Sequence, residues 1–438
     1  MKKIVALILA LAALPAWAQI KAGPMLGYSE MKEVLLWVQT EKAQPVKFVY
    51  WDKENPATKL TTEEVISSST TDYTVKLIAN QVQPGKKYQY EVHLGGKKVN
   101  VSYPLEFQTQ TLWQYRTDPP AFKFAVGSCV YTNEPAVDRP GQGYGKGMGI
   151  FSKIYDQKPQ FMVWGGDNVY FREVDWNTKT GMYHRYAEFK KQPELQPLFG
   201  SVHHYAIWDD HDYGPNDTDR SFWGKRWALE VFKNHWGNPN YIFENEAVTG
   251  TFFWEDCQFF LMDDRWFRAP NGFKDHNKEY WGEKQLQWLI DALKTSSAPF
   301  KFVVNGGQVV NPVGEFENYS AHAGERAKFL AELQRHNIPG VIFISGDRHH
   351  TNLQKLERPG TYPLYDLTVS PLTSGAGKPT DKELAGAPIV PGTQVNEMQN
   401  FGILEVSGKR TERMLKIQVF DKEGQPKWDY TIQAKDLR

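Results

Sequence analysis

Six short apolar segments of this 438-residue sequence each end on a side chain that can bind a metal ion or an anion. Thiolate, carboxylate, phenolate, amide and imidazole groups can all act as metal ligands. Because several carboxylates close together repel one another unless a cation neutralises them, these residue types predict a metal cluster rather than a serine or cysteine nucleophile. FKFAVGS leads to Cys129, FMVWGG to Asp167 and Tyr170, and HHYAIW to Asp209–Asp212. Further along the chain, QFFLM leads to Asp263–Arg265, KFVVNGG to Gln308, and VIFISG to Asp347–His350.

The elements that must position these groups are buried strands that alternate with helices. Amphipathic stretches at 221–236, 283–296 and 324–336 lie between the apolar segments. Strands buried on both faces with helices between them predict a layered α/β core over residues 120–438. Such sheets bind ligands outside the carboxyl ends of their strands, so we expect the six groups at one rim. The apolar runs at 365–370, 401–407 and 414–421 predict further strands that close one side of the core.

The first part of the mature chain has a different pattern. Segments 33–40, 45–52, 71–78 and 86–94 alternate apolar and polar residues, and short turn sequences separate them. This spacing predicts a small all-β sandwich over residues 19–112, of the fibronectin III-like kind. Asp118-Pro119-Pro120 is typical of a linker.

The N-terminus has the three parts of a secretory signal peptide. Lys2 and Lys3 precede an apolar run from Ile4 to Leu14, and Ala16-Trp17-Ala18 provides a small-x-small cleavage site. The run is shorter than the roughly 20 residues that span a bilayer. Residues 1–18 therefore predict general secretion, without a lipid anchor, to the periplasm or the cell exterior.

Charge and cysteine content limit the classes of function. Acidic and basic residues balance at 51 each, so the sequence predicts no nucleic-acid binding and no attraction to an anionic membrane. In an oxidising compartment Cys129 and Cys257 could pair, but their positions in apolar runs favour a buried Cys257 and a Cys129 with chemistry of its own. The oligomeric state is left open.

Four of the segment ends resemble motifs of one enzyme superfamily. Gly166–Tyr170 resembles the GDxxY motif of dinuclear metallophosphoesterases, and Trp208–His211 resembles the WDDH element of its PhoD-like branch. Gly346–His349 is similar to the GDxH of that branch, and Ser128-Cys129 stands where PhoD-like proteins carry a cysteine ligand. The chain thus resembles PhoD-like alkaline phosphatases and phosphodiesterases, whose N-terminal β-domain also fits the predicted layout.

The resemblance implies two metal sites that share one carboxylate, with Asp167 as the bridge. Cys129, Tyr170 and His349 would hold an Fe³⁺-like ion. Asp210 and Asp347 would hold a second metal, and Gln308 stands where other members place a histidine. The oxygen-rich second site favours Ca²⁺, with Mn²⁺, Mg²⁺ or Zn²⁺ as alternatives.

The resemblance also implies roles toward a phosphate group. His211 would act as the general acid for the leaving group or as a donor in the transition state. Arg265 would bind phosphate oxygens, with Arg268 a weaker candidate. Apart from the resemblance, Asn216, Asp217 and Asp219 form a polar cluster on a loop that could reach the second metal through Asn216 or be an exposed turn.

The predicted function is hydrolysis of small phosphate esters by metal-bound hydroxide, because two metals can activate water and hold a phosphoryl group. The sequence leaves open whether the substrate is a monoester or a diester. One alternative is a hydrolase with Cys129 as its nucleophile. The other is a non-catalytic cell-surface binding protein in which the metals are structural.

Overall fold

A computed structural model describes residues 20–438 of the chain. The predicted signal peptide lies outside the described residues. Within residues 20–438, no helix combines the length and apolar character needed to cross a membrane.

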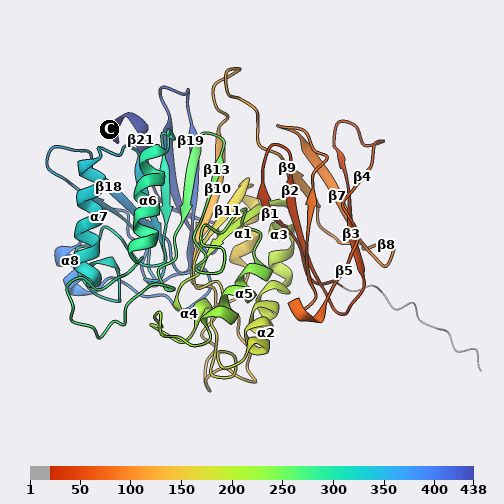
Figure 1. The fold of residues 1–438 in the computed structure, drawn as a ribbon, viewed down its shortest axis with the longest axis horizontal. Helices are drawn as coiled ribbons and strands as arrows, with labels where there is room; N and C mark the ends of the chain where they lie inside the picture. The colour runs from red at the N-terminus through yellow and green to blue at the C-terminus, as the bar shows by residue number, and fades with distance from the viewer. Residues whose placement is uncertain (1–19) are drawn as a thin grey trace, which may run out of the picture.

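Two large sheets form the body of the molecule (Figure 1). The first has nine strands in the order β21 (Pro426–Gln433), β20 (Met414–Asp421), β19 (Asn400–Ser407), β10 (Phe122–Gly127), β11 (Phe161–Gly165), β12 (His203–Ile207), β1 (Ile20–Ser29), β2 (Val34–Thr40) and β6 (Thr74–Ala79). The second has six, in the order β13 (Gly250–Trp254), β14 (Cys257–Leu261), β15 (Lys301–Val304), β16 (Val341–Ser345), β18 (Leu364–Thr368) and β17 (Asn352–Leu356).

Aromatic side chains fill the space between these two sheets. Phe124 of β10 meets Phe259 of β14 edge to face, with ring centroids 5.2 Å apart. Tyr205 of β12 stacks on Phe252 of β13 at 3.6 Å. The predicted α/β class is therefore confirmed, as a mixed fold with several sheets. The aromatic side chains form a continuous core between the nine-stranded and the six-stranded sheet.

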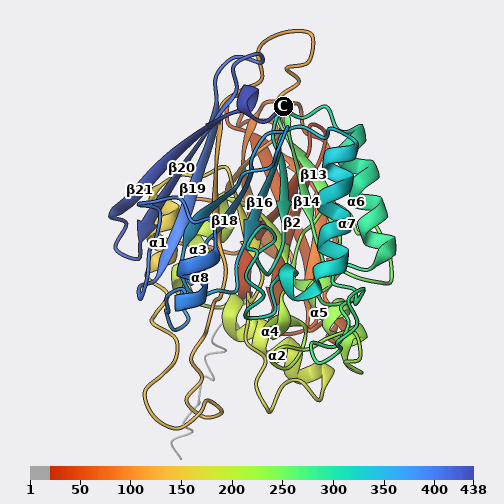
Figure 2. The same cartoon turned by 90° about the vertical axis from the view of Figure 1, so that its left-hand side faces the viewer.

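Helices cover the outer faces of the two sheets. Figure 2 shows α6 (Glu283–Thr295) and α7 (Ala323–Arg335) side by side along the strands of the six-stranded sheet. These two helices and α5 (Lys225–His235) coincide with the three amphipathic stretches of the sequence. The remaining helices are α1 (Ile150–Asp156), α2 (Lys179–Lys190), α3 (Gln196–Ser201), α4 (Asp210–Tyr213) and α8 (Asp381–Gly386), with 3₁₀ turns at Ser69–Thr71, Pro193–Leu195, Tyr319–His322 and Ala434–Asp436.

The six site-bearing strands divide equally between the two sheets. Strands β10, β11 and β12 are parallel neighbours in the first sheet, and β14, β15 and β16 are parallel neighbours in the second. Their carboxyl ends meet because glycines allow close approach of the two layers. A Cβ on Gly306 would lie 2.5 Å from Cγ of Asp209, and one on Gly346 would lie 2.6 Å from Oγ of Ser128.

The N-terminal region is all β, as predicted, but its strands belong to two different sheets. Strands β1, β2 and β6 extend the nine-stranded sheet, because Leu26 of β1 pairs in parallel with His203 of β12. The domain boundary at residues 112–120 and the fibronectin III-like character remain predictions. The other N-terminal strands form a third sheet of β4 (Leu60–Thr61), β3 (Pro45–Asp52), β7 (Lys87–Leu94) and β8 (Lys97–Lys98), with β5 (Val65–Ile66) on β3 and β9 (Glu106–Gln108) on β7.

Replacing His203 by Gln should remove part of the acid sensitivity of the fold. Burial lowers the pKa of His203 to about 4, and the neutral ring donates from Nδ1 to the carbonyl of Gly27 at 2.8 Å. The unfolded chain binds the extra proton below about pH 6.5, so stability is fully present above that pH. Up to about 3 kcal/mol is lost as the pH falls from about 6.5 to about 4.

Urea unfolding at about pH 7 and about pH 5 measures this effect. We expect a smaller difference in unfolding free energy between the two pH values for His203→Gln than for the wild type. The exposed His276 provides the control, because His276→Gln should keep the wild-type difference. An unchanged pH dependence in His203→Gln would contradict the assignment.

Candidate metal centre

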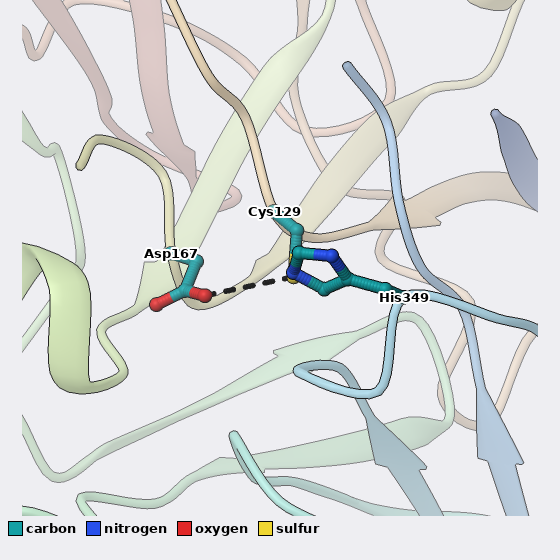
Figure 3. Close-up of side chains that lie close together, drawn as sticks. All are labelled: Cys129, Asp167 and His349. Carbon is teal, nitrogen blue, oxygen red and sulfur yellow. Dashed lines mark hydrogen bonds between the residues drawn. The ribbon is translucent and has the colours of Figure 1, made fainter. Parts of the chain in front are cut away.

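Cys129, Asp167 and His349 meet at the carboxyl ends of three strands (Figure 3). They follow β10, β11 and β16, and each offers a ligand atom within 4.8 Å of the others. The Sγ atom of Cys129 lies 3.6 Å from Oδ2 of Asp167. The hydroxyl of Tyr170 lies 3.1 Å from Nε2 of His349, so the phenol joins the same group. The structure thus brings together four of the predicted ligands.

Asp167 also belongs to a second group, with Asp210 and His211. Ligand atoms of these three residues again lie within 4.8 Å of one another. The first turn of α4 positions the group, because Asp209 caps that helix and the backbone N–H of His211 donates to Oδ1 of Asp167 at 3.2 Å. Two clusters that share one carboxylate match the chemistry of a pair of bridged metal ions.

Four of the seven predicted ligands have left-handed backbone conformations. The φ angles are +60° for Cys129, +51° for Asp167, +64° for Asp347 and +53° for His349. Such conformations are uncommon outside glycine and cost about 1–3 kcal/mol each unless the surrounding structure enforces them. Their concentration at the strand ends indicates a site built for function rather than for stability.

The carboxylates of the site are buried close to one another. Burial and the charge of Asp210 raise the pKa of Asp167 well above its usual range. Burial raises the pKa of Asp347 to about 7, and the charge of Asp210 adds to this. Oδ1 of Asp210 has no hydrogen-bond partner among the described residues. Bound cations would neutralise these charges and satisfy this unpaired oxygen, so the donor set fits metal ions.

A third group lies beside the second and consists of oxygen ligands alone. Oxygens of Asp210, Asp217 and Glu317 lie within 4.8 Å of one another, and the N–H of Asp217 donates to Oδ2 of Asp210 at 2.7 Å. The loop that carries Asn216 and Asp217 therefore lies beside the second group, with Asp217 in the ligand group and Asn216 in the cavity lining described below; a metal contact through Asn216 stays a prediction. Such an all-oxygen set is the kind that Ca²⁺, Mg²⁺ and Mn²⁺ prefer.

A cavity of about 650 Å³ opens over these groups and provides room for a substrate. We call it the metal cavity. Its walls include Asp167, Asp210, His211, Asp347 and His349 among the predicted residues. Three cationic side chains also line it, namely Lys278, Arg348 and Lys378.

Gln308 is directed away from the metal cavity. Its amide nitrogen donates to Oγ1 of Thr368 at 2.8 Å, and its amide oxygen accepts from Nδ2 of Asn311 at 2.8 Å. The side chain is fully buried, and the metal cavity has no contribution from it within residues 20–438. These contacts give Gln308 a role in joining the loop after β15 to β18.

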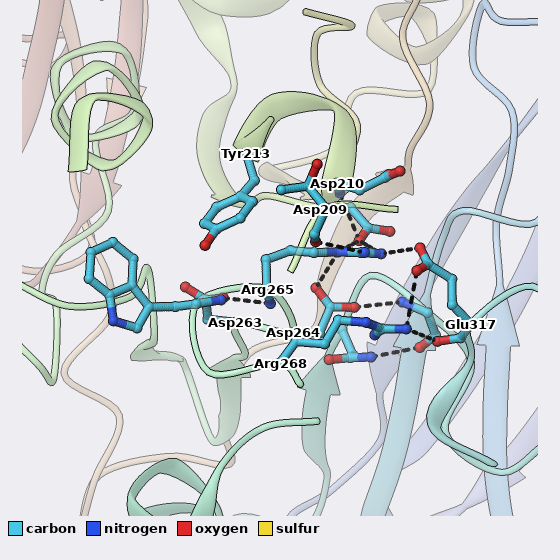
Figure 4. A network of polar contacts seen from close by, with 12 residues as sticks. Asp209, Asp210, Tyr213, Asp263, Asp264, Arg265, Arg268 and Glu317 are labelled. Atoms are coloured by element: carbon cyan, nitrogen blue, oxygen red, sulfur yellow. Dashed lines mark hydrogen bonds and ion pairs between the residues drawn. The ribbon is translucent and has the colours of Figure 1, made fainter. Parts of the chain in front are cut away.

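Arg265 is enclosed in a network of acidic groups (Figure 4). Its guanidinium contacts Asp209 at 2.5 Å and Glu317 at 2.8 Å, and the side chain is buried. Arg268 is buried as well and contacts the same Glu317 at 3.2 Å. Neither arginine is among the residues of the described chain that line the metal cavity. In this structure both arginines contact carboxylates of the site, and phosphate binding by Arg265 stays a prediction.

Replacing Arg265 by Met should therefore destabilise the fold. Removing one partner of a buried ion pair leaves an uncompensated charge, here on Asp209, at a cost of about 3–5 kcal/mol. Denaturant unfolding of the metal-free protein measures the loss. Arg335→Met, in an exposed ion pair on α7, is the control and should cost at most about 1 kcal/mol. Wild-type stability combined with a raised KM for phosphate esters would instead support the phosphate-binding role.

Besides Glu317, two further residues at the site were not predicted from the sequence. The hydroxyl of Tyr144 lies 3.2 Å from Nδ1 of His349, where it can fix the orientation of that ring. The hydroxyl of Ser370 donates to Sγ of Cys129 at 3.1 Å. Ser370 ends the apolar run 365–370, so the rule that identified the other strand ends would have found it. Tyr144 lies in a glycine-rich loop, where no such signal exists.

Both cysteines are buried and free in the structure. This agrees with the preferred expectation that they do not form a disulfide. Burial and the charge of Asp347 raise the pKa of Cys129 to about 11 in the absence of metal.

Two family models match parts of the chain. The model of the PhoD-like phosphatase family matches residues 244–416, which include Arg265, Gln308, Asp347 and His349. A domain of unknown function, DUF7800, matches residues 17–112. No curated protein matches the sequence.

The fold is similar to that of a solved structure described as PhoD. The likeness has a TM-score of 0.78 at 16% sequence identity and covers 97% of this chain and 92% of that chain. A Vps29 double mutant from Entamoeba histolytica (11% identity, 71% of this chain and 98% of that one) has a TM-score of only 0.25. The FN1–FN3 domains of chicken CNTN1 (17% identity, 20% and 30%) reach 0.16, so neither supports a structural argument. The resemblance to PhoD-like phosphatases is confirmed, and it supports a phosphoric ester hydrolase.

Proposed function

We propose that this protein is an exported, metal-dependent phosphoesterase that hydrolyses small phosphate esters. The observation that carries the proposal is the pair of ligand clusters that share Asp167 at the floor of one cavity. The PhoD-like match and the PhoD fold support the same reaction class.

We assign the two metal positions by the chemistry of their donors. Cys129, Tyr170 and His349 supply thiolate, phenolate and imidazole, a set suited to Fe³⁺. Asp210 and Asp347 supply oxygens for Ca²⁺ or a similar hard cation, with Asp217 and Glu317 close by. Gln308 is left out because both ends of its amide are occupied. Bound at these positions, the metals would acidify a water molecule and neutralise phosphate charge.

The protein's own side chains would bind and activate the ester. Lys278 and Lys378 line the metal cavity and supply positive charge for phosphate oxygens. Arg348 lines it as well, but its guanidinium is paired with Glu383 at 2.8 Å. His211 lines the metal cavity, so its ring can reach a substrate oxygen there. We assign His211 to the leaving group, as its general acid or its hydrogen-bond donor.

The two alternative functions have less support. Cys129 is fully buried, and its raised pKa keeps the metal-free thiol protonated at neutral pH, which disfavours a cysteine nucleophile. A purely structural metal site would have a closed shell of ligands. Here a cavity of about 650 Å³ reaches Asp167 and Asp210, so substrate has access to the ligands.

Metal analysis of the purified protein, with parallel assays on a phosphomonoester and a phosphodiester, tests the proposal. We expect bound iron with calcium or a similar cation, and hydrolysis that chelators abolish. Thiol alkylation after chelator treatment distinguishes a cysteine hydrolase, which would keep its activity in chelator and lose it on alkylation. A protein with no bound metal that hydrolyses neither ester would overturn the proposal.

Export is tested separately. Expression of the full chain with and without residues 1–18 should place only the full-length protein in the periplasm or the medium. Cleavage after Ala18 would appear as Gln19 at the N-terminus of the exported protein.

A further inference from the structure

A second cavity, of about 740 Å³, adjoins the metal cavity. We call it the aromatic cavity. The two cavities share Tyr144, His211 and Asn216 in their linings, so they meet at these three residues. A volume of this size lies within the range of pockets that bind small molecules. Apart from His211 and the metal-ligand candidate Tyr170, no residue that lines the aromatic cavity was predicted to act on the substrate from the sequence alone, although Asn216 was a possible route to the second metal.

Aromatic rings form much of the wall of the aromatic cavity. Tyr131, Tyr144, Tyr170, Phe171 and Trp176 all contribute to its lining. Tyr131 packs edge to face on Tyr144 with centroids 5.0 Å apart and lies 5.2 Å from Tyr170. Tyr170 in turn lies 4.1 Å from the ring of His211. A chain of rings therefore runs from the candidate leaving-group donor into the aromatic cavity.

A buried cation accompanies these rings. Arg172 lines the aromatic cavity, its side chain is nine-tenths buried, and its Nε has no hydrogen-bond partner in the part of the chain that the structure describes. Its ion pair, at 3.3 Å, is with the exposed carboxylate of Glu173. Arg139 contacts the other oxygen of Glu173 at 3.7 Å and lines the same cavity. Because the ion-pair partner of Arg172 is an exposed carboxylate, the guanidinium can exchange that weak contact for a hydrogen-bond acceptor of a ligand.

We propose that the aromatic cavity binds a planar aromatic group on the leaving alcohol of the substrate, such as a nucleobase or an aryl ring. This inference rests on the proposed phosphoesterase function and names its substrate class. The rings supply stacking surfaces, and Arg172 supplies a donor to an acceptor atom on the aromatic group.

The position of His211 relates the two cavities to the reaction. With the phosphoryl group in the metal cavity, water adds to phosphorus and the bond from phosphorus to the ester oxygen breaks. His211 lies where the cavities meet, so it can give a proton to that oxygen as the alcohol departs. The released alcohol then occupies the aromatic cavity. A small aliphatic group, such as glycerol, would leave the aromatic walls without contacts.

Two matched substrate pairs test the inference on the metal-loaded full-length protein. Adenosine 5′-monophosphate and ribose 5-phosphate both release a primary alcohol of the same sugar and differ in the base. In the same way, 2-phenylethyl phosphate and ethyl phosphate differ in an aryl ring. We expect kcat/KM to favour the aromatic member of at least one pair by about tenfold or more, the scale of base stacking on protein side chains. The pair that responds identifies whether a nucleobase or an aryl ring is bound.

Replacement of Trp176 by Leu provides the matched variant. We expect it to lower the preference for the aromatic substrate about tenfold or more. Trp223 is exposed and absent from the described linings of both cavities, so Trp223→Leu should keep the wild-type preference. Equal kcat/KM within both pairs, or an unchanged preference in Trp176→Leu, would overturn the inference.

Calorimetric titration with adenosine separates this inference from the proposed function. If the protein hydrolyses no ester, the proposed function fails, but adenosine binding that Trp176→Leu weakens would still support the aromatic cavity as a binding site. Hydrolysis of all four esters without adenosine binding or an aromatic preference would retain the proposed function and overturn the inference.

Discussion

Replacing Asp167 by Asn should remove the bound metals and lower kcat/KM for phosphate esters by about 10³-fold or more. Asp167 is the residue common to the two ligand clusters, so its loss affects both metal positions. Metal ions contribute several kcal/mol to transition-state stabilisation, and each 1.36 kcal/mol corresponds to a factor of ten.

The metal content and the folding of this variant distinguish a chemical effect from a structural one. Burial and the charge of Asp210 oppose ionisation of Asp167 in the metal-free protein. A neutral amide of the same shape should therefore leave the stability of that protein unchanged or higher. The exposed Asp156, in the last turn of α1, is the control, because Asp156→Asn should keep both metal and activity. Full activity in Asp167→Asn would show that the motif assignment is wrong.

The strand ends were predictable from the sequence because buried parallel strands have nearly continuous apolar runs. The predicted segments FKFAVGS, FMVWGG and VIFISG each extend one residue beyond the parallel strands β10, β11 and β16. The rule that ligands gather at carboxyl ends then brings Cys129 and Asp167 together correctly. Each of these steps needs only a local pattern and one general property of sheets.

The division of six strands into two sheets was not predictable in this way. Strand order depends on pairing between segments far apart in the chain. Strand β1 (Ile20–Ser29), for example, pairs with β12 (His203–Ile207). Helix α2 was also missed, because its buried positions include Arg185 and Lys190 and its pattern is therefore not amphipathic. Arg185 can be buried because Asp175, 2.8 Å away, pairs with it.

The direction of a side chain after a strand end was the least predictable feature of the site. Gln308 and Arg265 both follow apolar runs, yet one contacts Thr368 and the other Asp209. Glu317 and Tyr144 reach the site from loops without any periodic pattern. Loop conformation depends on tertiary contacts, so the sequence indicates which residues gather near the rim but not which of them face the cavity.

Replacing His211 by Asn should give a loss of activity that depends on the leaving group. A positioned proton donor contributes about 10²- to 10⁴-fold when the departing oxygen is strongly basic. We therefore expect kcat for an alkyl phosphate ester to fall by about that factor. A 4-nitrophenyl ester releases a weakly basic oxygen that needs little protonation, so its kcat should fall by about tenfold or less.

Metal content and a matched histidine complete this test. We assign the second metal to carboxylates and not to the His211 ring, and the backbone N–H that donates to Asp167 survives the substitution, so His211→Asn should keep the bound metals. Loss of one metal from the variant would instead make the ring a ligand. His184 is exposed on α2, where it contacts Glu134 at 2.9 Å, and His184→Asn should leave both rates unchanged. Equal losses for the two esters would place His211 on the phosphoryl oxygens instead of the leaving group. Since the two cavities meet at His211, that result would also move the expected position of the alcohol away from the aromatic cavity.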